Sequence, residues 1–223
     1  MKKIALLAAL AFTAAAQAAP TTLSENFDDV GALSAAGWSF VNNSTTPVGL
    51  NWGQGNPGVF TAQAGADNSF AAASFLSTQQ FNGAASNWLI SPVLTLDSAS
   101  LLSFYVRNGG SGFFDTLEVR LSTNGTSADV GSTPASVGDF STLLGIYSSD
   151  TAADWVQLSY GLGSLTASTD VRLAFRYVVD DTSANGNYLG IDTVSVSAVP
   201  EPAAYLLMGL GLAGLLVRRR LTA

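Results

Sequence analysis

The chain has 223 residues, of which nine are Lys or Arg, sixteen are Asp or Glu, and none is His or Cys. Without His or Cys it cannot contain a Ser-His-Asp triad, a cysteine nucleophile, a disulfide bond or an ordinary zinc site. Residues 19–199 carry four arginines against fifteen carboxylates, a net charge of −11. Such a region repels phosphate backbones, so we expect no nucleic acid as a partner.

Residues 1–18 are expected to form a secretory signal peptide that uses the Sec machinery and is removed by signal peptidase. Met1-Lys2-Lys3 is a basic start, residues 4–15 are an uncharged apolar run, and Ala16-Gln17-Ala18 has the small-x-small pattern of a cleavage site. The alternative is an N-terminal helix of the fold, but this helix would be apolar all round and followed at once by Pro20. We therefore expect the chain to be exported.

Residues 19–198 are predicted to form one all-β domain, an antiparallel β-sandwich of jelly-roll type. The region is long enough to bury one sizeable core. Short runs rich in β-branched and aromatic residues, each bounded by Gly, Asn, Asp or Ser, predict strands. These runs are residues 98–108, 115–125, 154–163, 170–181 and 188–198, with one or two further strands around 23–27 and 37–41. Many short strands at this spacing favour two packed antiparallel sheets.

The segment from Val171 to Val179 shows the strand pattern most clearly. Its odd-numbered positions are all apolar and alternate with Arg172 and Arg176, which is the period of two of a half-buried strand. The following Asn185-Gly186 pair favours a tight turn. Long Gly-, Asn- and Ala-rich loops are expected in the first eighty residues, and loops of this kind usually carry the binding function of a sandwich.

Two carboxylates share the parity of the apolar residues in their predicted strands. Asp192 shares parity with Tyr188, Val194 and Val196. Glu25 shares parity with Leu23 and Phe27, so both carboxylates are expected to face the core. A buried unpaired carboxylate must be protonated, paired or bound to a metal.

Two alternatives for Asp192 remain open. Gly190 can introduce a bulge that turns the side chain outward, or Arg172 or Arg176 can pair with it.

Aromatic and acidic side chains in loops offer two further candidate sites. Trp52 lies in a Gly-rich loop and is the best candidate for an exposed ring that stacks on a sugar, with packing of the loop as the alternative. Trp88 and Trp155 occupy strand-like positions and are expected in the core. The Asp180-Asp181 pair suggests glycoside hydrolysis, but a solvated hairpin loop explains it more simply.

The order of motifs along residues 21–198 resembles that of the choice-of-anchor J domains, relatives of the cleaved-adhesin and MAM-type jelly rolls. The motifs are "ENFDD…GW", "NWLISPVLTL…LLSFYVRN", "DTLEVRLSTNG", "WVQLSYGLG" and "VRLAFRYVVD…GIDTVSV". This resemblance implies an extracellular sandwich used for adhesion or surface display, often stabilised by a cation, and it does not imply an enzyme.

The same resemblance suggests a place for a cation. In such a jelly roll the first and last strands are near neighbours, which brings Glu25 and Asp192 to one site. Asp28, Asp67 and Asn68 are the family-like positions that would complete the shell. Carboxylate and carbonyl oxygens suit Ca²⁺, so a structural calcium ion is predicted here.

The last 25 residues carry a short apolar segment between prolines and arginines. Residues 203–217 are uncharged and span roughly 22 Å as a helix, less than the ~30 Å of a hydrocarbon core. The cluster Arg218, Arg219 and Arg220 would hold the C-terminal end in the cytoplasm. The segment is therefore expected to be a weak membrane anchor.

Val199-Pro200-Glu201-Pro202, the short span and the arginine cluster closely resemble the PEP-CTERM sorting signal of Gram-negative bacteria. In that family an exosortase, a membrane transpeptidase-like enzyme, recognises the Pro-Glu-Pro motif. The resemblance makes Pro200, Glu201, Pro202 and the arginines the recognition residues. An ordinary single-span anchor is the alternative.

These features favour an exported, non-catalytic protein of the cell surface or extracellular matrix, active in biofilm or adhesion. It would be anchored transiently in the inner membrane and then sorted through its C-terminal signal. A carbohydrate-binding module for extracellular polysaccharide is the second hypothesis, and a polysaccharide hydrolase or lyase is the third.

Overall fold

The computed structural model describes residues 21–49, 51–110, 112–151, 154–198 and 211. The predicted signal peptide, the Pro-Glu-Pro motif and the arginine cluster lie outside the described residues, as does all of the predicted span except Gly211. Within the described part of the chain, no helix has the length and apolar character needed to cross a membrane.

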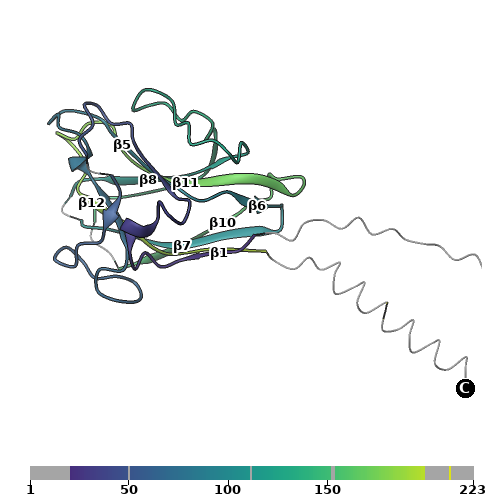
Figure 1. Ribbon diagram of the computed structural model, residues 1–223. Coiled ribbons are helices and arrows are strands. Elements are labelled where there is room, and N and C mark those ends of the chain that lie inside the picture. Colours follow the sequence, from purple (N-terminus) through teal and green to yellow (C-terminus); the bar gives the residue numbers. More distant parts are fainter. Residues whose placement is uncertain (1–20, 50, 111, 152–153, 199–210, 212–223) are drawn as a thin grey trace, which may run out of the picture.

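The described strands form two antiparallel sheets that pack face to face (Figure 1). The strands of the first sheet are β1 (Leu23–Glu25), β3 (Gly53–Gln54), β4 (Ala71–Ser74), β7 (Ser100–Asn108), β10 (Val156–Gly161) and β12 (Tyr188–Ala198). Those of the second sheet are β2 (Ser39–Asn42), β5 (Ala85–Ile90), β6 (Leu94–Leu96), β8 (Asp115–Ser122), β9 (Thr142–Ser149) and β11 (Thr169–Val179). Single 3-10 turns follow β1 and β4, at η1 (Val30–Ala32) and η2 (Phe75–Ser77).

The strand order confirms the predicted all-β sandwich. In the first sheet it is β10-β7-β12-β4-β3, with β1 paired to β12. In the second it is β2-β5-β11-β8-β9, with β6 paired to β11. Strands distant in sequence therefore lie side by side, as jelly-roll topology requires.

The core between the sheets is built from alternate residues of the long strands. In β7 the inward side chains include Leu102, Phe104 and Val106, and in β8 they include Leu117 and Val119. None of these five is exposed to solvent. The period of two of a β-strand thus places the apolar residues of β7 and β8 in one shared core.

Each sheet also buries part of its outer face beneath a long loop. Residues 55–70, the first outer loop, place Phe60 and Phe70 on the first sheet with their ring centroids 5.0 Å apart. Residues 123–141, the second outer loop, place Phe140 on the second sheet against Trp88.

Because of the second outer loop, β11 is buried on both faces. Every residue from Val171 to Tyr177 is buried, including Arg172 and Arg176. The prediction of a half-buried strand is therefore wrong for β11, since the sequence pattern does not reveal which loop covers the polar face.

The chain enters and leaves the domain at one end of the sandwich. Strand β1 pairs with the last residues of β12, so both termini of the domain lie together (Figure 1). Strand β12 has 11 residues and begins at the opposite end, which at ~3.3 Å per residue is roughly 35 Å away. We call this opposite end the distal end; it carries the loops 75–84, 109–114 and 180–187.

Candidate functional site

The structure brings together the three segments that were predicted to hold a metal. Gln54 Nε2 donates hydrogen bonds to the carbonyls of Phe27 (2.8 Å) and Asn68 (2.6 Å). A Cβ atom on Gly65 would lie 3.3 Å from the Asp28 carboxylate. Because β1 also pairs with β12, the chain around residues 25–28, 65–68 and 192 converges as the jelly-roll resemblance implied.

Asp192 is fully buried, but it does not face the core between the sheets. Strand β12 has an irregularity between Asp192 and Ser195, where Thr193 has a φ of 51°. Ile191 before this bulge and Val194 after it both belong to the main core cluster. The predicted core-facing parity of Asp192 is therefore wrong, because the bulge exchanges the two faces of the strand. The alternative of a bulge at Gly190 that turns Asp192 outward is also wrong, because Gly190 pairs regularly with Ala72 and Arg107 and Asp192 stays buried.

Four hydrogen bonds satisfy the Asp192 carboxylate. Oδ2 accepts from the backbone N–H groups of Gln63 (2.8 Å) and Ala64 (3.1 Å), while Oδ1 accepts from the N–H (2.6 Å) and hydroxyl (3.2 Å) of Thr193. Burial raises the pKa of Asp192, and these hydrogen bonds oppose that shift. The Asp192 side chain thus attaches the first outer loop to β12, and each of its carboxylate oxygens accepts two hydrogen bonds.

The donor set for a calcium ion is incomplete in this arrangement. Glu25 Oε1 accepts a hydrogen bond from the Phe27 amide (2.8 Å), and Asp28, Asp67 and Asn68 are exposed. Among the residues that the structure describes, no three Asp, Glu, His or Cys side chains are grouped closely enough to hold a metal. The calcium site therefore stays a prediction.

Trp52 is 3% exposed and packs in the main core cluster. Its Nε1 donates to the Asn87 carbonyl at 3.0 Å, which satisfies the buried indole N–H. The prediction of an exposed, sugar-stacking ring at Trp52 is therefore wrong, and packing of the loop is the correct alternative. Trp88 is fully buried as predicted, whereas Trp155 is half-buried and donates to the Thr61 carbonyl (3.0 Å).

A second buried carboxylate, Asp115, was missed by the sequence analysis. Its Oδ1 accepts from the Tyr177 hydroxyl (2.7 Å) and the Asn187 amide (2.7 Å), and Oδ2 accepts from the Tyr188 amide (3.3 Å). Burial raises the pKa of Asp115, and burial also raises that of Tyr177. Asp115 shares the parity of Leu117 in β8, so the argument applied to Asp192 would have found it.

The Asp180-Asp181 pair belongs to the solvated loop between β11 and β12. Asp181 Oδ1 accepts from the amide (2.8 Å) and the hydroxyl (2.6 Å) of Ser183, and these hydrogen bonds lower the pKa of Asp181. Asp180 is exposed. The hairpin-loop interpretation of this pair is confirmed.

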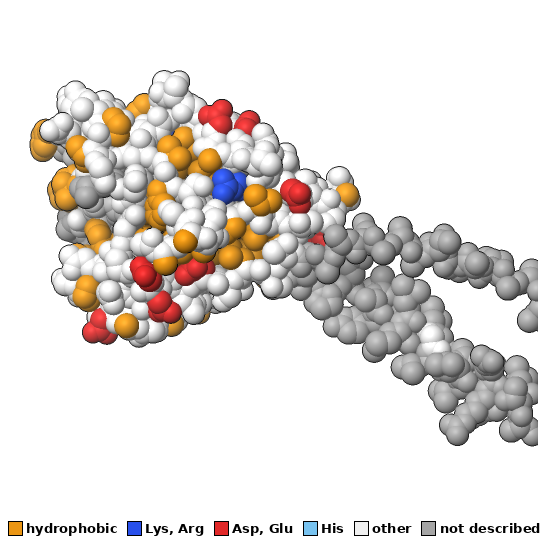
Figure 2. Space-filling model, viewed as in Figure 1, with side chains coloured by type: hydrophobic (Ala, Val, Ile, Leu, Met, Phe, Trp, Pro, Cys, Tyr) orange, Lys and Arg blue, Asp and Glu red, His pale blue; other side chains and the backbone are white. Residues whose placement is uncertain are grey.

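The distal end exposes large apolar side chains from several loops (Figure 2). The loop 180–187 joins its neighbours, because its Thr182 and Gly186 amides donate to the carbonyls of Gly83 and Phe114 at 2.9 Å each. The exposed side chains are Leu76 (52%), Phe81 (81%), Phe113 (46%) and Phe114 (48%). Asp115 and these backbone bonds hold the loops that carry them.

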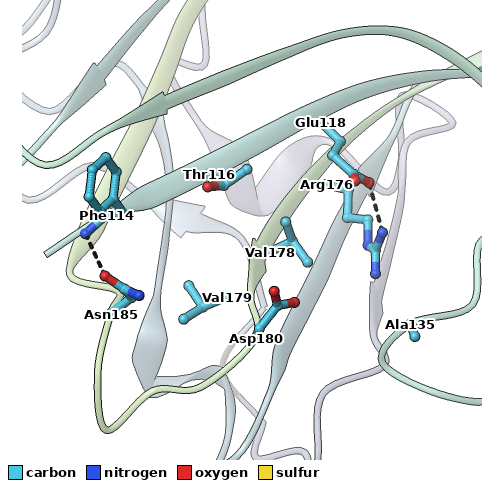
Figure 3. A pocket seen from close by; sticks show the side chains of 9 residues that line it. All are labelled: Phe114, Thr116, Glu118, Ala135, Arg176, Val178, Val179, Asp180 and Asn185. Carbon is cyan, nitrogen blue, oxygen red and sulfur yellow. Dashed lines mark hydrogen bonds and ion pairs between the residues drawn. The ribbon is translucent and has the colours of Figure 1, made fainter.

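A groove of about 390 Å³ lies on the outer face of the second sheet beside the distal end (Figure 3). Phe114 forms one side, and Asn185 Oδ1 accepts a hydrogen bond from its amide (3.2 Å). Ala135 of the second outer loop lies on the opposite side. The groove is also lined by Thr116, Glu118, Arg176, Val178, Val179 and Asp180.

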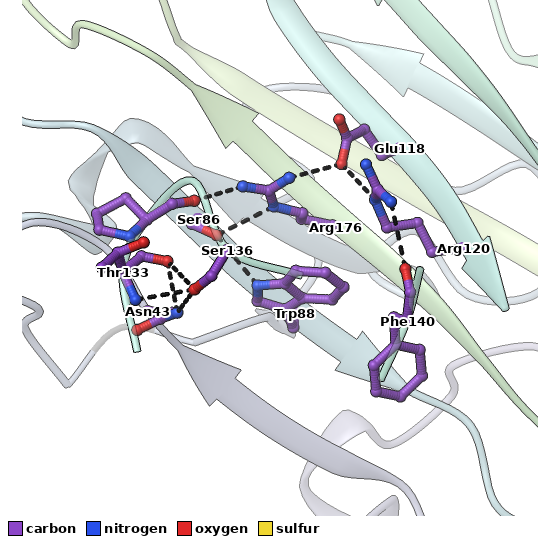
Figure 4. Close-up of polar contacts among 10 residues, drawn as sticks. Asn43, Ser86, Trp88, Glu118, Arg120, Thr133, Ser136, Phe140 and Arg176 are labelled. Carbon is purple, nitrogen blue, oxygen red and sulfur yellow. Dashed lines mark hydrogen bonds and ion pairs between the residues drawn. The ribbon is translucent and has the colours of Figure 1, made fainter. Parts of the chain in front are cut away.

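An ion-pair network borders this groove (Figure 4). Glu118 Oε2 accepts from Arg120 Nε and from Arg176 Nη1, both at 2.7 Å. Arg176 is 4% exposed; it also donates to Ser86 Oγ (3.1 Å) and to the Pro134 carbonyl. Burial opposes ionisation of Glu118, but the two guanidinium groups outweigh it and lower the pKa.

The arginine network excludes the second alternative for Asp192. Arg176 forms an ion pair with Glu118, and Arg172 Nη2 donates a hydrogen bond to the Gly37 carbonyl (2.8 Å). Neither of these two arginines pairs with Asp192.

The two antiparallel sheets and the strand order define a jelly-roll β-sandwich. Among solved structures, the domain is similar to the K1 cleaved adhesin domain of Lys-gingipain from Porphyromonas gingivalis W83. The TM-score is 0.55 and the identity 21%, over 81% of this chain and 99% of that one. The K3 cleaved adhesin domain of the same protein gives a TM-score of 0.54 and 18% identity, over 81% of this chain and all (100%) of that one. At these identities the likeness concerns the fold alone.

The C-terminal residues 198–220 match the model of the PEP-CTERM protein-sorting motif. The predicted sorting signal is therefore confirmed, and it follows directly after β12. No curated protein matches the chain.

Proposed function

We propose that the protein is an exported, non-catalytic surface protein that is attached through its C-terminal end and presents its distal end to an extracellular partner. One observation carries this proposal. The sorting motif begins where β12 ends, and the exposed apolar loops lie at the other end of that strand, roughly 35 Å away. A domain held by its C-terminus would therefore turn these loops outward.

Export and sorting would proceed in three stages. The Sec machinery would translocate the chain, and signal peptidase would cleave before Ala19. Residues 203–217 would then hold the protein briefly in the inner membrane of a Gram-negative cell, with Arg218–Arg220 in the cytoplasm. An exosortase would process the chain at Pro200-Glu201-Pro202 and release it to the cell surface or matrix.

Glu118 supports the non-catalytic part of the proposal. Glycoside hydrolysis needs a carboxylic acid that stays protonated, with a raised pKa, to donate to the leaving group. Glu118 lines the groove, but Arg120 and Arg176 lower its pKa and keep it ionised. The other carboxylate in that lining, Asp180, is exposed to water.

The exposed aromatic rings of the distal end support adhesion as the role of the displayed surface. Large apolar side chains that are exposed at one end of a domain are candidates for contact with a partner. A carbohydrate-binding module is the second candidate function, and the groove beside Phe114 is the feature that favours it.

Replacing two distal rings tests the adhesion proposal. Cells that produce the Phe81→Ser, Phe113→Ser double variant should attach less to extracellular matrix than wild-type cells, with unchanged amounts of protein at the surface. Leu143→Ser, Ile146→Ser is the matched control, because these side chains are 44% and 55% exposed but lie on β9, outside the distal loops. Equal attachment by both double variants and the wild type would contradict the proposal.

A further inference from the structure

The groove beside the distal end combines an aromatic wall, an apolar floor and uncommitted polar groups. Phe114 is 48% exposed, and Val178 is half-buried on the outer face of β11. Asp180 has no hydrogen-bond partner among the described residues, and the side-chain oxygen of Asn185 accepts a hydrogen bond from the Phe114 backbone amide. The volume of about 390 Å³ falls within the ~300–1,000 Å³ of small-molecule sites.

The charges of the groove select among ligands. Arg176 is the only cation among the described residues that line it, and this side chain is 4% exposed and already bonded to Glu118, Ser86 and the Pro134 carbonyl. It therefore has little capacity to bind an anionic group. Asp180 is the free charge of the groove, and the domain as a whole is acidic. Anionic ligands are thus repelled, whereas neutral ligands with hydroxyl groups can donate to the carboxylate.

We propose that this groove binds a neutral oligosaccharide, with one sugar ring stacked on Phe114 and its hydroxyl groups bonded to Asp180 and to the Asn185 Nδ2 amide. Aromatic rings suit the apolar faces of sugar rings, while carboxylate and amide groups match hydroxyl donors and acceptors. The inference rests on the proposed surface function and names the ligand class of one part of the distal end.

The second outer loop completes the groove opposite Phe114. Its Pro134 carbonyl accepts from Arg176, and Ala135 lines the groove. Asn43 Nδ2 donates to the Thr133 carbonyl at 2.7 Å (Figure 4) and to the Gly131 carbonyl at 3.2 Å, and these hydrogen bonds hold the middle of this loop. Because both sides are fixed before a ligand arrives, little ordering of the protein is needed on binding.

The test measures binding of the purified full chain by calorimetry or NMR. The three probes are neutral hexose oligosaccharides, uronate oligosaccharides and chitosan oligosaccharides. Phe114→Ala and Asp180→Asn should each weaken binding of a neutral oligosaccharide by roughly 10-fold or more. Phe81→Ala and Asp154→Asn are the matched controls, because these exposed side chains lie outside the groove, and they should leave the affinity unchanged.

Three outcomes would overturn the inference. They are no binding of neutral oligosaccharides, preferential binding of the uronate or chitosan oligomers, and binding that survives both groove substitutions. Failure here is distinguishable from failure of the surface proposal, because that proposal is tested with Phe81 and Phe113, neither of which lines the groove.

Discussion

Asp115 offers the sharpest test of how the distal end is held in place. Asp115→Ala removes a carboxylate that accepts hydrogen bonds from the Tyr177 hydroxyl and from the amides of Asn187 and Tyr188. Asn187 ends loop 180–187 and Tyr188 begins β12, so the substitution removes the contacts that join this part of the chain to the start of β8.

The expected loss of stability follows from the donors that lose their acceptor. The Tyr177 side chain is fully buried, and the Tyr188 amide is partly buried. A buried donor without an acceptor costs about 1–3 kcal/mol, so we expect the free energy of unfolding to fall by about 2–3 kcal/mol at neutral pH. For a domain of this size that lowers the melting temperature by roughly 4–12 °C.

A double-mutant cycle separates the hydroxyl from the rest of the effect. Tyr177→Phe should destabilise the wild type by about 1 kcal/mol, because it removes a buried hydrogen bond. In the Asp115→Ala background the same change should restore about 1 kcal/mol, because it removes an unsatisfied hydroxyl.

Urea unfolding followed by tryptophan fluorescence measures all four proteins of the cycle. The control is Asp154→Ala, which removes an exposed carboxylate and should change stability by less than ~0.5 kcal/mol. The reasoning is refuted if Asp115→Ala is as stable as this control, or if Tyr177→Phe has the same effect in both backgrounds.

Three further predictions concern pH, packing and calcium. Burial raises the pKa of Asp115 above its usual 3.8, so the stability of the wild type relative to Asp115→Asn should increase as the pH falls through the raised pKa. The pKa of Glu118 is lowered below 4.5, so the stability of the wild type relative to Glu118→Gln should instead decrease as the pH falls. Urea midpoints of the wild type and both variants, measured from neutral pH to about pH 3, test these two opposite trends. Gly55→Ala should lower the free energy of unfolding by about 1–3 kcal/mol, because the added Cβ would lie 2.3 Å from the buried Phe70 ring. The control is Gly53→Ala, whose Cβ meets no atom within 4 Å, and it should leave the melting temperature nearly unchanged. If the domain holds Ca²⁺, its melting temperature should be higher with the ion than with a chelator, and identical temperatures would count against the site.

Local pattern was enough to predict the sandwich but not the loops that cover it. The alternation in β7, β8 and β11 matches the residues that face the core, whereas in β12 it fails for the residues before the bulge. The predicted strands did not include β3, β4, β5, β6 or β9. Strand β9 is an edge strand without a fully buried residue and has a bulge in its pairing with β8.

The errors in the candidate site have physical causes. The parity argument failed at Asp192 because Thr193 adopts a φ of 51°, a conformation that a β-branched residue rarely takes and that the sequence does not signal. Trp52 lies in a Gly-rich stretch, yet it reaches a buried carbonyl on β5. The parity of Asp115 with Leu117 could have revealed this buried carboxylate from the sequence. The groove could not be predicted, because it forms between segments that are distant in sequence.

The central claim is that the C-terminal motif is a sorting signal that is removed when the protein reaches the surface. Intact-mass and peptide mass spectrometry of the protein recovered from cells and medium tests it most directly. We predict a chain that begins at Ala19 and ends near Glu201, without Arg218–Arg220. A mature protein that retains those three arginines would contradict the proposed route to the surface.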